Sequence, residues 1–214
     1  MTFVVVFAGW VFSLCLHEFM HAFVAYQGGD YTVKDKGYLT FNPLKYTHPV
    51  YSLLMPILFL LAGGIGLPGG AVYIERWRLR GPRWETAVSL AGPLSNAVLA
   101  LTLGLTLRFT PVANSIFGPG LAFLAWLQIS AVVLNLLPVP PFDGFGAIEP
   151  HLPYEWRVKL AQTQGAFAII VFLVLWYVPF VNRGFWWLVS WLAHLVGIPL
   201  DAASLGFSQF LFWQ

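Results

Sequence analysis

The stretch at residues 4–26 reads VVVFAGWVFSLCLHEFMHAFVAY, and it decides the class of fold. It is longer than the roughly 20 apolar residues that an α-helix needs to cross a hydrocarbon core of about 30 Å. It also carries His17, Glu18 and His21, which are costly to bury in lipid unless they are paired, ligated or hydrated. The stretch therefore predicts a membrane-crossing helix that holds a chemical site.

The composition of the whole chain is that of a membrane protein. Of its 214 residues, 58% are hydrophobic and 9% are charged, whereas roughly a quarter of an average soluble domain is charged. The net charge of +2 is too small to indicate a nucleic-acid partner. The first stretch lacks a basic n-region and a small-residue cleavage site, so we expect it to remain in the mature protein. We predict one membrane domain over residues 1–214, with its core at 4–150 and accessory C-terminal helices at 164–200.

Five apolar stretches predict an all-α polytopic fold. They are residues 4–26, 86–107, 121–137, 165–181 and 185–198. The last stretch is short and rich in tryptophan, as in a tilted or interfacial helix. Weak strand character at residues 31–41 adds a short β-hairpin to the prediction.

A sixth apolar stretch, residues 51–67, runs into a glycine-rich segment that breaks helices. Basic residues lie on both sides of it, and short basic loops stay in the cytoplasm. These residues are Lys34, Lys36 and Lys45 before the stretch, and Arg76, Arg78, Arg80 and Arg83 after it. We therefore expect a re-entrant hairpin beside an internal cavity, because non-helical backbone at membrane depth must be covered by protein or water. The N-terminus is then outside and the C-terminal tail inside.

His17, Glu18 and His21 form an H-E-x-x-H motif. Residues four apart lie about 40° apart around an α-helix, so both imidazoles can reach one ion. In zinc hydrolases the glutamate takes a proton from a water whose pKa the ion has lowered. The motif alone is common by chance, and its place within an apolar helix makes it stronger evidence for a metal site. The competing interpretation is a polar cluster packed against another helix.

A catalytic zinc needs a third protein ligand and one open position. Asp143 is the best candidate, because the prolines at 138–141 end the third full helix just before it and force extended backbone at membrane depth. If residues 51–67 are re-entrant, two crossings separate His21 from Asp143 and both lie on the cytoplasmic side. If that stretch spans the bilayer, the count is three and the site cannot assemble simply. The alternative for Asp143 is a turn residue before glycine.

The order of motifs resembles the site-2 protease family of intramembrane zinc proteases. The resemblance covers about residues 10–155 and rests on HEFMHAFVA at 17–25, GD at 29–30, LTFNPLK at 39–45, AGPLSN at 91–96 and NLLPVPPFDG at 135–144. It implies His17, His21 and Asp143 as ligands of one Zn²⁺, Glu18 as catalytic base, and Asn135 as a group that orients or stabilises the scissile carbonyl. It also implies transmembrane protein substrates, as in the regulated release of membrane-tethered transcription regulators or the removal of signal-peptide remnants.

The chain departs from the family's pattern at Tyr46 and His48, where members with an apolar insertion often have a His and an Asp. Phe145 and Gly146 stand where Gly-Arg or Ser-Arg is common. These differences bear on substrate choice and gating, and we expect a compact subgroup without a PDZ-like domain. We expect a multi-pass protein of a bacterial cell membrane, with its active site toward the cytoplasm, the lipid bilayer as a partner, and a homo-oligomer compatible with the sequence.

Some alternatives stay open on sequence alone. Asn96 fits either close helix packing or a substrate groove, and His48 fits either an interfacial loop or a regulatory group beside the site. The function has alternatives as well. A membrane metal-binding transporter would bury the same His and Asp ligands but would not need Glu18, and a catalytically inert scaffold would not retain zinc.

Overall fold

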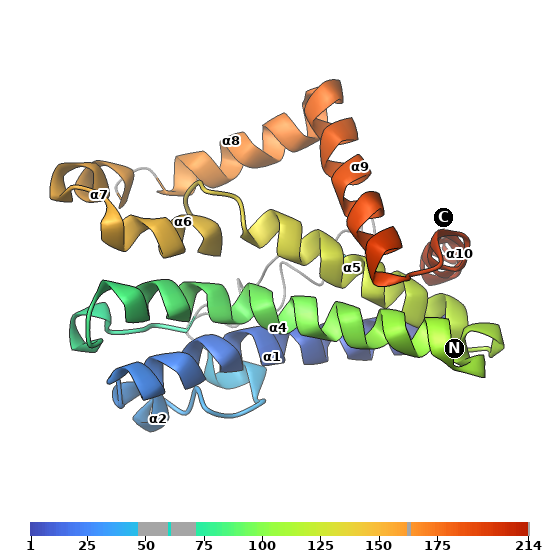
Figure 1. Ribbon diagram of the computed structural model, residues 1–214, viewed down its shortest axis with the longest axis horizontal. Helices are drawn as coiled ribbons and strands as arrows, with labels where there is room; N and C mark the ends of the chain where they lie inside the picture. The colour runs from blue at the N-terminus through green and yellow to red at the C-terminus, as the bar shows by residue number, and fades with distance from the viewer. Residues whose placement is uncertain (47–59, 61–71, 162–163, 214) are drawn as a thin grey trace.

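The protein is a bundle of long helices in the computed structural model, which describes residues 1–46, 60, 72–161 and 164–213. Helices α1 (Thr2–Gly28), α4 (Pro82–Phe109) and α5 (Gly118–Asn135) run along the long axis of the molecule (Figure 1). Each of the three is long and apolar enough to cross a membrane. The helices predicted at residues 4–26, 86–107 and 121–137 are thereby confirmed, with small differences at their ends.

Glycine and proline shape two of these helices. α1 stops at Gly29, whose φ of 117° lies in the left-handed region that glycine adopts without strain. The Asp30 N–H then closes the turn on the Ala25 carbonyl at 3.0 Å. Within α4, Pro93 has no N–H, so the Ser89 carbonyl loses its usual partner in the helix. Pro93 thus interrupts the hydrogen bonds of α4 at the depth where α4 faces the histidines of α1.

The β-hairpin predicted at residues 31–41 is wrong. This segment forms the short helix α2 (Thr32–Asp35) followed by turns, and the described part of the chain contains no strand. The buried Asp30 carboxylate explains the helix, because its Oδ1 accepts the Thr32 N–H at 3.1 Å and the Thr32 hydroxyl at 2.6 Å. Its Oδ2 accepts the Glu75 N–H at 2.8 Å, which ties this turn to a segment much later in the chain.

Short elements connect the long helices. Among the described residues they are η1 (Pro43–Lys45), η3 (Arg76–Arg78), η4 (Pro111–Asn114), α6 (Asp143–Ile148), η5 (Glu149–His151) and α7 (Tyr154–Ala161). The hairpin predicted at 51–67 lies outside the described residues except for Leu60, which is buried and packs with Trp10 and Leu127. α4 begins beside the end of α1, since the Arg80 N–H donates to the Gly28 carbonyl at 3.0 Å. The chain therefore leaves α1 and enters α4 at the same end of the bundle.

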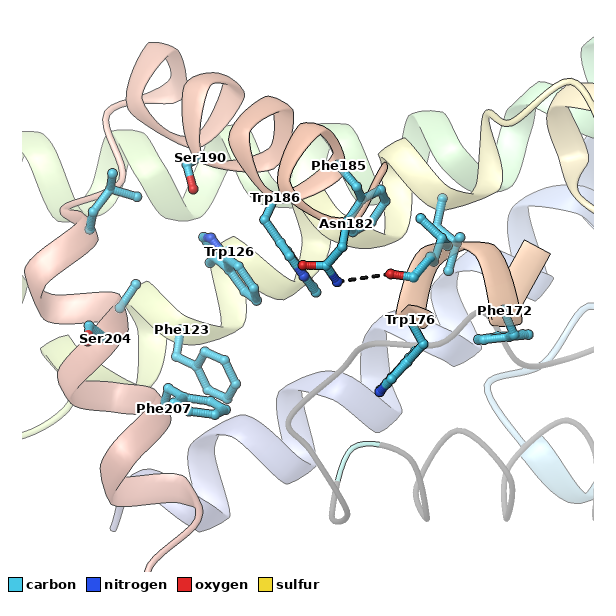
Figure 2. Close-up of a pocket in the computed structure, with 14 residues that line it drawn as sticks. Phe123, Trp126, Phe172, Trp176, Asn182, Phe185, Trp186, Ser190, Ser204 and Phe207 are labelled. Carbon is cyan, nitrogen blue, oxygen red and sulfur yellow. Dashed lines mark hydrogen bonds between the residues drawn. The ribbon is translucent and has the colours of Figure 1, made fainter. Parts of the chain in front are cut away.

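The apolar stretches at 165–181 and 185–198 form one bent pair instead of two separate crossings. The part of α8 (Gln164–Tyr177) from Ile169 onward meets α9 (Pro179–Val196) at an angle of 91°. Val178 is extended, as is usual before proline, and Pro179 can start a helix but cannot continue one. The Asn182 amide donates to the Leu175 carbonyl at 2.9 Å, so the interrupted end of α8 keeps a partner (Figure 2). Five complete crossings are therefore not confirmed.

The last helix, α10 (Leu200–Phe210), lies beside the start of α1. The Thr2 hydroxyl donates to the Gln209 side chain at 2.5 Å, and the rings of Phe3 and Phe210 stack at 5.3 Å. α2, α6 and α7 lie at the opposite end of the molecule (Figure 1). The prediction that the C-terminal tail lies opposite the N-terminus is therefore wrong. The physical reason is the bend at Pro179, because α8 and α9 together amount to at most one span by length and composition.

A cavity of about 550 Å³ lies between α5, α8, α9 and α10 (Figure 2). Half of the residues that line it are aromatic, and Trp126 of α5 stacks on Trp186 of α9 at 4.9 Å. Phe123 and Phe207 close one end (Figure 2). None of the side chains predicted to carry chemistry lines this cavity. It therefore belongs to the packing of the bent pair and is separate from the predicted site.

The hydrogen bond from Asn182 at the bend is expected to contribute to the stability of the fold. An Asn182→Ala variant should have a free energy of unfolding lower by about 1 kcal/mol, because a carbonyl of α8 loses its partner away from water. Reversible unfolding in detergent micelles measures the difference. Thr102→Ala is the control, since that exposed hydroxyl bonds only to the Val98 carbonyl of its own helix. Equal stability of the two variants would show that the bend does not depend on this bond.

Candidate metal centre

Three side chains converge between α1 and the start of α6. The Nε2 atoms of His17 and His21 lie 3.0 Å apart. The Asp143 carboxylate reaches His17 Nε2 at 3.2 Å through Oδ2 and His21 Nε2 at 3.5 Å through Oδ1. A tetrahedral ion with zinc–ligand bonds of 2.0–2.1 Å keeps its ligand atoms about 3.3 Å apart. The spacing of the three donor atoms therefore fits one zinc ion.

Hydrogen bonds behind the rings turn both imidazoles toward the same point. His17 Nδ1 lies 2.8 Å from Asn96 Oδ1, and His21 Nδ1 lies 2.6 Å from the Val88 carbonyl oxygen. A carbonyl oxygen can only accept, so each Nδ1 carries the hydrogen and each Nε2 presents its lone pair. Two lone pairs and a carboxylate that face one another need a positive charge between them, which a metal ion supplies as it binds.

Gly92 leaves the space that such a cation needs. A Cβ at this position would lie 2.4 Å from His21 Nε2 and 2.5 Å from His17 Nε2. No real Cβ comes that close to a neighbour, so any larger residue on this face of α4 would fill the point on which the ligands converge. Glycine, which has no Cβ, allows the approach.

The close packing of α6 places Asp143. A Cβ at Gly144 would lie 2.3 Å from the Leu136 carbonyl oxygen, so α6 turns back directly against the end of α5. The Thr86 hydroxyl donates to the Ala147 carbonyl at 2.8 Å, which holds α6 against α4. The Pro140–Pro141 peptide bond in the preceding turn is cis. The turn after α5 thus delivers a carboxylate to the histidines of α1.

The charge state of Asp143 suits a metal ligand. Burial raises the pKa of the Asp143 carboxyl, but positive charge on the His21 and His17 imidazoles outweighs burial and holds that pKa below its usual range. A bound cation between neutral imidazoles would act on the carboxyl in the same direction. The carboxyl group is therefore ionised at neutral pH. An ionised carboxylate and two neutral imidazoles are a donor set that zinc accepts.

Glu18 is next to the first ligand on α1 and is 3% exposed. Its Oε2 accepts the Val72 N–H at 3.1 Å. Glu75 anchors the segment that carries Val72, since it pairs with Lys36 at 2.8 Å and with Arg78 at 2.6 Å. These hydrogen bonds lower the pKa of Glu75 to about 2. One carboxylate oxygen of Glu18 is thus held by backbone, which orients the other.

The remaining residues singled out in the sequence take varied positions. Asn135 is the last residue of α5 and is 4% exposed, and its action on a scissile carbonyl stays a prediction. The Tyr46 hydroxyl lies 3.1 Å from the carbonyl oxygens of both Cys15 and Thr40, so Tyr46 fastens its loop to α1. His48 lies outside the described residues.

Some parts of the site were not identified from the sequence. The backbone of Val72 and the Val88 carbonyl are invisible to a motif search, because any residue type supplies them. In the sequence, Asn96 fits either helix packing or a substrate groove, and the structure places its amide oxygen 2.8 Å from His17 Nδ1. The available signal was its position four residues after Gly92, which puts both residues on one face of α4.

Comparisons with known proteins agree with this geometry. Three relatives carry the name "Putative zinc metalloprotease". Rip2 of Mycolicibacterium smegmatis is 50% identical over 99% of this chain and 82% of its own length, and Rip2 of Mycobacterium tuberculosis strain H37Rv is 47% identical over the same shares. YwhC of Bacillus subtilis is 36% identical over 82% of this chain and 81% of its own length. No family model and no solved structure matches the chain. Through these relatives and the H-E-x-x-H motif of α1, the chain belongs to the site-2 protease family of zinc metalloproteases.

Proposed function

We propose that this protein is an intramembrane zinc metalloprotease that hydrolyses peptide bonds of transmembrane protein substrates. The observation that carries the proposal is the convergence of His17, His21 and Asp143 among helices that are long and apolar enough to span a bilayer. The names of the relatives support the same metal and the same class of reaction. An ordinary soluble protease would have no reason to place two of these ligands, His17 and His21, on such a helix.

The residues of the chain bind, orient and transfer protons. His17, His21 and Asp143 would hold one Zn²⁺, which when bound supplies a Lewis acid that lowers the pKa of a water and polarises a carbonyl. Glu18 takes the proton from the attacking water and gives it to the leaving amine. Asn135 donates a hydrogen bond to the carbonyl oxygen as charge develops there, and a donor of this kind contributes a few kcal/mol.

The basic residues indicate the side from which the site is reached. Arg80, which precedes α4, bonds through its guanidinium to the carbonyls of Gln27 and Gly28 at the end of α1. The metal cluster lies in the half of α1 nearest this end. Short basic loops stay in the cytoplasm, so we infer that the active site opens toward the cytoplasm. A substrate helix must unwind first, because its carbonyls are held in its own hydrogen bonds.

A Glu18→Gln variant tests the proposal. Glutamine has the shape of glutamate but cannot accept the proton, and loss of a general base slows a reaction by roughly 10²–10⁴-fold. We expect zinc to stay bound and proteolysis to be lost. The measurement compares the membrane-protein fragments of cells that carry the wild type or the variant, together with the zinc content of each purified protein.

The control is Glu155→Gln, which changes an exposed glutamate of α7 in the same way. It should leave both the fragments and the zinc content unchanged. Identical fragment sets for wild type and Glu18→Gln would reject proteolysis, and an unchanged cellular phenotype in that case would point to metal transport. A zinc content near zero in the wild type would point to an inert scaffold.

A further inference from the structure

A chain of buried hydrogen bonds runs from His17 through two neighbouring helices and back to α1. His17 Nδ1 lies 2.8 Å from Asn96 Oδ1. The Asn96 amide donates to Gln128 Oε1 at 2.9 Å, and the Gln128 amide donates to the Ser13 hydroxyl oxygen at 3.1 Å. The Ser13 hydroxyl donates in turn to the Trp10 carbonyl at 2.8 Å. We call Asn96, Gln128 and Ser13 the relay.

Each link of the relay has a direction, because a side-chain amide has one end that accepts and one that donates. The Ser13 hydrogen lies on the Trp10 carbonyl, so the Ser13 oxygen accepts and the Gln128 NH₂ group must face it. Gln128 then turns its oxygen to the Asn96 NH₂ group. Asn96 in turn presents its oxygen to His17. His17 is left with its hydrogen on Nδ1 and a lone pair on Nε2, where Asp143 and His21 converge.

The burial of the relay indicates that it has a purpose beyond packing. Asn96 is 4% exposed, Gln128 0% and Ser13 1%. Amides are costly to bury, and a partly satisfied polar network is worse than an apolar core. Gln128 stands on α5, which supplies none of the three converging ligands. An apolar side chain of similar size would fill the same space without this cost.

We propose that Gln128 is a positioning residue for the metal centre. It orients the Asn96 amide, which fixes His17 in the tautomer that binds zinc, and it thereby raises the affinity of the site for zinc. Groups behind a ligating histidine typically contribute 10–100-fold in metal affinity. The inference rests on the zinc site of the proposed function and does not require that the protein cleave peptides.

A double-mutant cycle separates orientation from packing. The full chain is purified in detergent, and its zinc affinity is measured by competition with a chromophoric chelator. Gln128→Met removes the amide at similar size and should weaken zinc binding by roughly 10-fold or more. Asn96→Asp places two accepting oxygens opposite His17, so the side chain at position 96 accepts from His17 whichever way it is turned. In the Asn96→Asp background, Gln128→Met should change zinc affinity by no more than about twofold, the usual scatter of independent sites.

Ser130→Ala is the matched control for Gln128. Ser130 is buried on the same helix and donates only to the Leu127 carbonyl of that helix, so its removal should leave zinc affinity unchanged. Equal losses from Gln128→Met in both backgrounds would show that Gln128 acts through packing and would overturn the proposal. Wild-type affinity in Gln128→Met would overturn it too.

A gentler variant covers the case in which Gln128→Met does not fold. Ser13→Ala then takes its place in the same cycle, because it removes the acceptor that orients Gln128 and barely changes the packing. If Ser13→Ala weakens zinc binding when Asn96 is present but not in the Asn96→Asp background, the relay is supported. If Ser13→Ala leaves zinc affinity unchanged in both backgrounds, the relay is rejected. If the cycle gives the expected zinc affinities while Glu18→Gln leaves the membrane-protein fragments unchanged, the relay is retained and proteolysis is rejected.

Discussion

A Gly92→Ala variant is expected to lose both zinc and proteolysis while it keeps its helical fold. The added Cβ would lie 2.4 Å from His21 Nε2 and 2.5 Å from His17 Nε2, where the cation must sit. The imidazoles can avoid it only by turning away from Asn96 and the Val88 carbonyl, which abandons the orientation that zinc needs. Alanine favours a helix over glycine by about 1 kcal/mol, so α4 itself should persist. The zinc content of the purified protein measures the loss of the metal, and circular dichroism measures whether the helical fold is kept.

Gly184→Ala is the control for this substitution. Gly184 also lies in a helix, but a Cβ there would meet nothing within 4 Å. It should therefore bind zinc and cleave substrate like the wild type. Normal zinc content in Gly92→Ala would show that the ion, if one binds, does not lie between the two histidines and Asp143.

Asp143→Asn should weaken zinc binding by about 100-fold or more, which corresponds to about 2.8 kcal/mol. Asparagine keeps the shape of the ligand but removes its charge, and zinc prefers an ionised carboxylate to a neutral amide oxygen. The effect is visible in stability, because a ligand that binds only the folded state stabilises it. Free zinc at 100 times the wild-type Kd should stabilise the wild type by about 2.7 kcal/mol and the variant by about 0.4 kcal/mol. Unfolding with and without zinc gives both values.

Asp35→Asn provides the matched comparison, since Asp35 is an exposed carboxylate at the end of α2. Its variant should gain as much stability from zinc as the wild type does. If Asp143→Asn also gained the full amount, Asp143 would not be a ligand and its approach to the histidines would have another cause.

The framework of the fold could be predicted because long apolar segments have few alternatives in a bilayer. α1, α4 and α5 follow directly from such segments. The bent pair could not be predicted in the same way, although Pro179 lies within the stretch at 165–181. Hydropathy averages over a proline, and the bend also depends on the bond from Asn182 to the Leu175 carbonyl, which only the folded chain shows. The strand propensity at 31–41 was overridden by one buried carboxylate, that of Asp30.

The candidate site divides in a similar way. The placing of His17 and His21 on one side of α1 follows from helical geometry, which their spacing in the sequence fixes. Asp143 is the candidate in the sequence because prolines end the third helix just before it, with the crossing count as a check, and the structure places the three side chains together. Gln128 and Ser13 read in the sequence only as polar residues within apolar helices. Their pairing depends on the rotation of three helices about their own axes, which no local pattern determines.

The contact between the start of α1 and the end of α10 makes the protein a candidate for circular permutation. Thr2 and Gln209 are hydrogen-bonded, so a short linker could join the two ends of the described chain, and new ends could be opened in the surface turn at η4. Such circular permutation is tolerated where ends are close and the new break is exposed. The permuted protein would insert its helices in a different order during synthesis, and would show whether the order of insertion affects the final assembly.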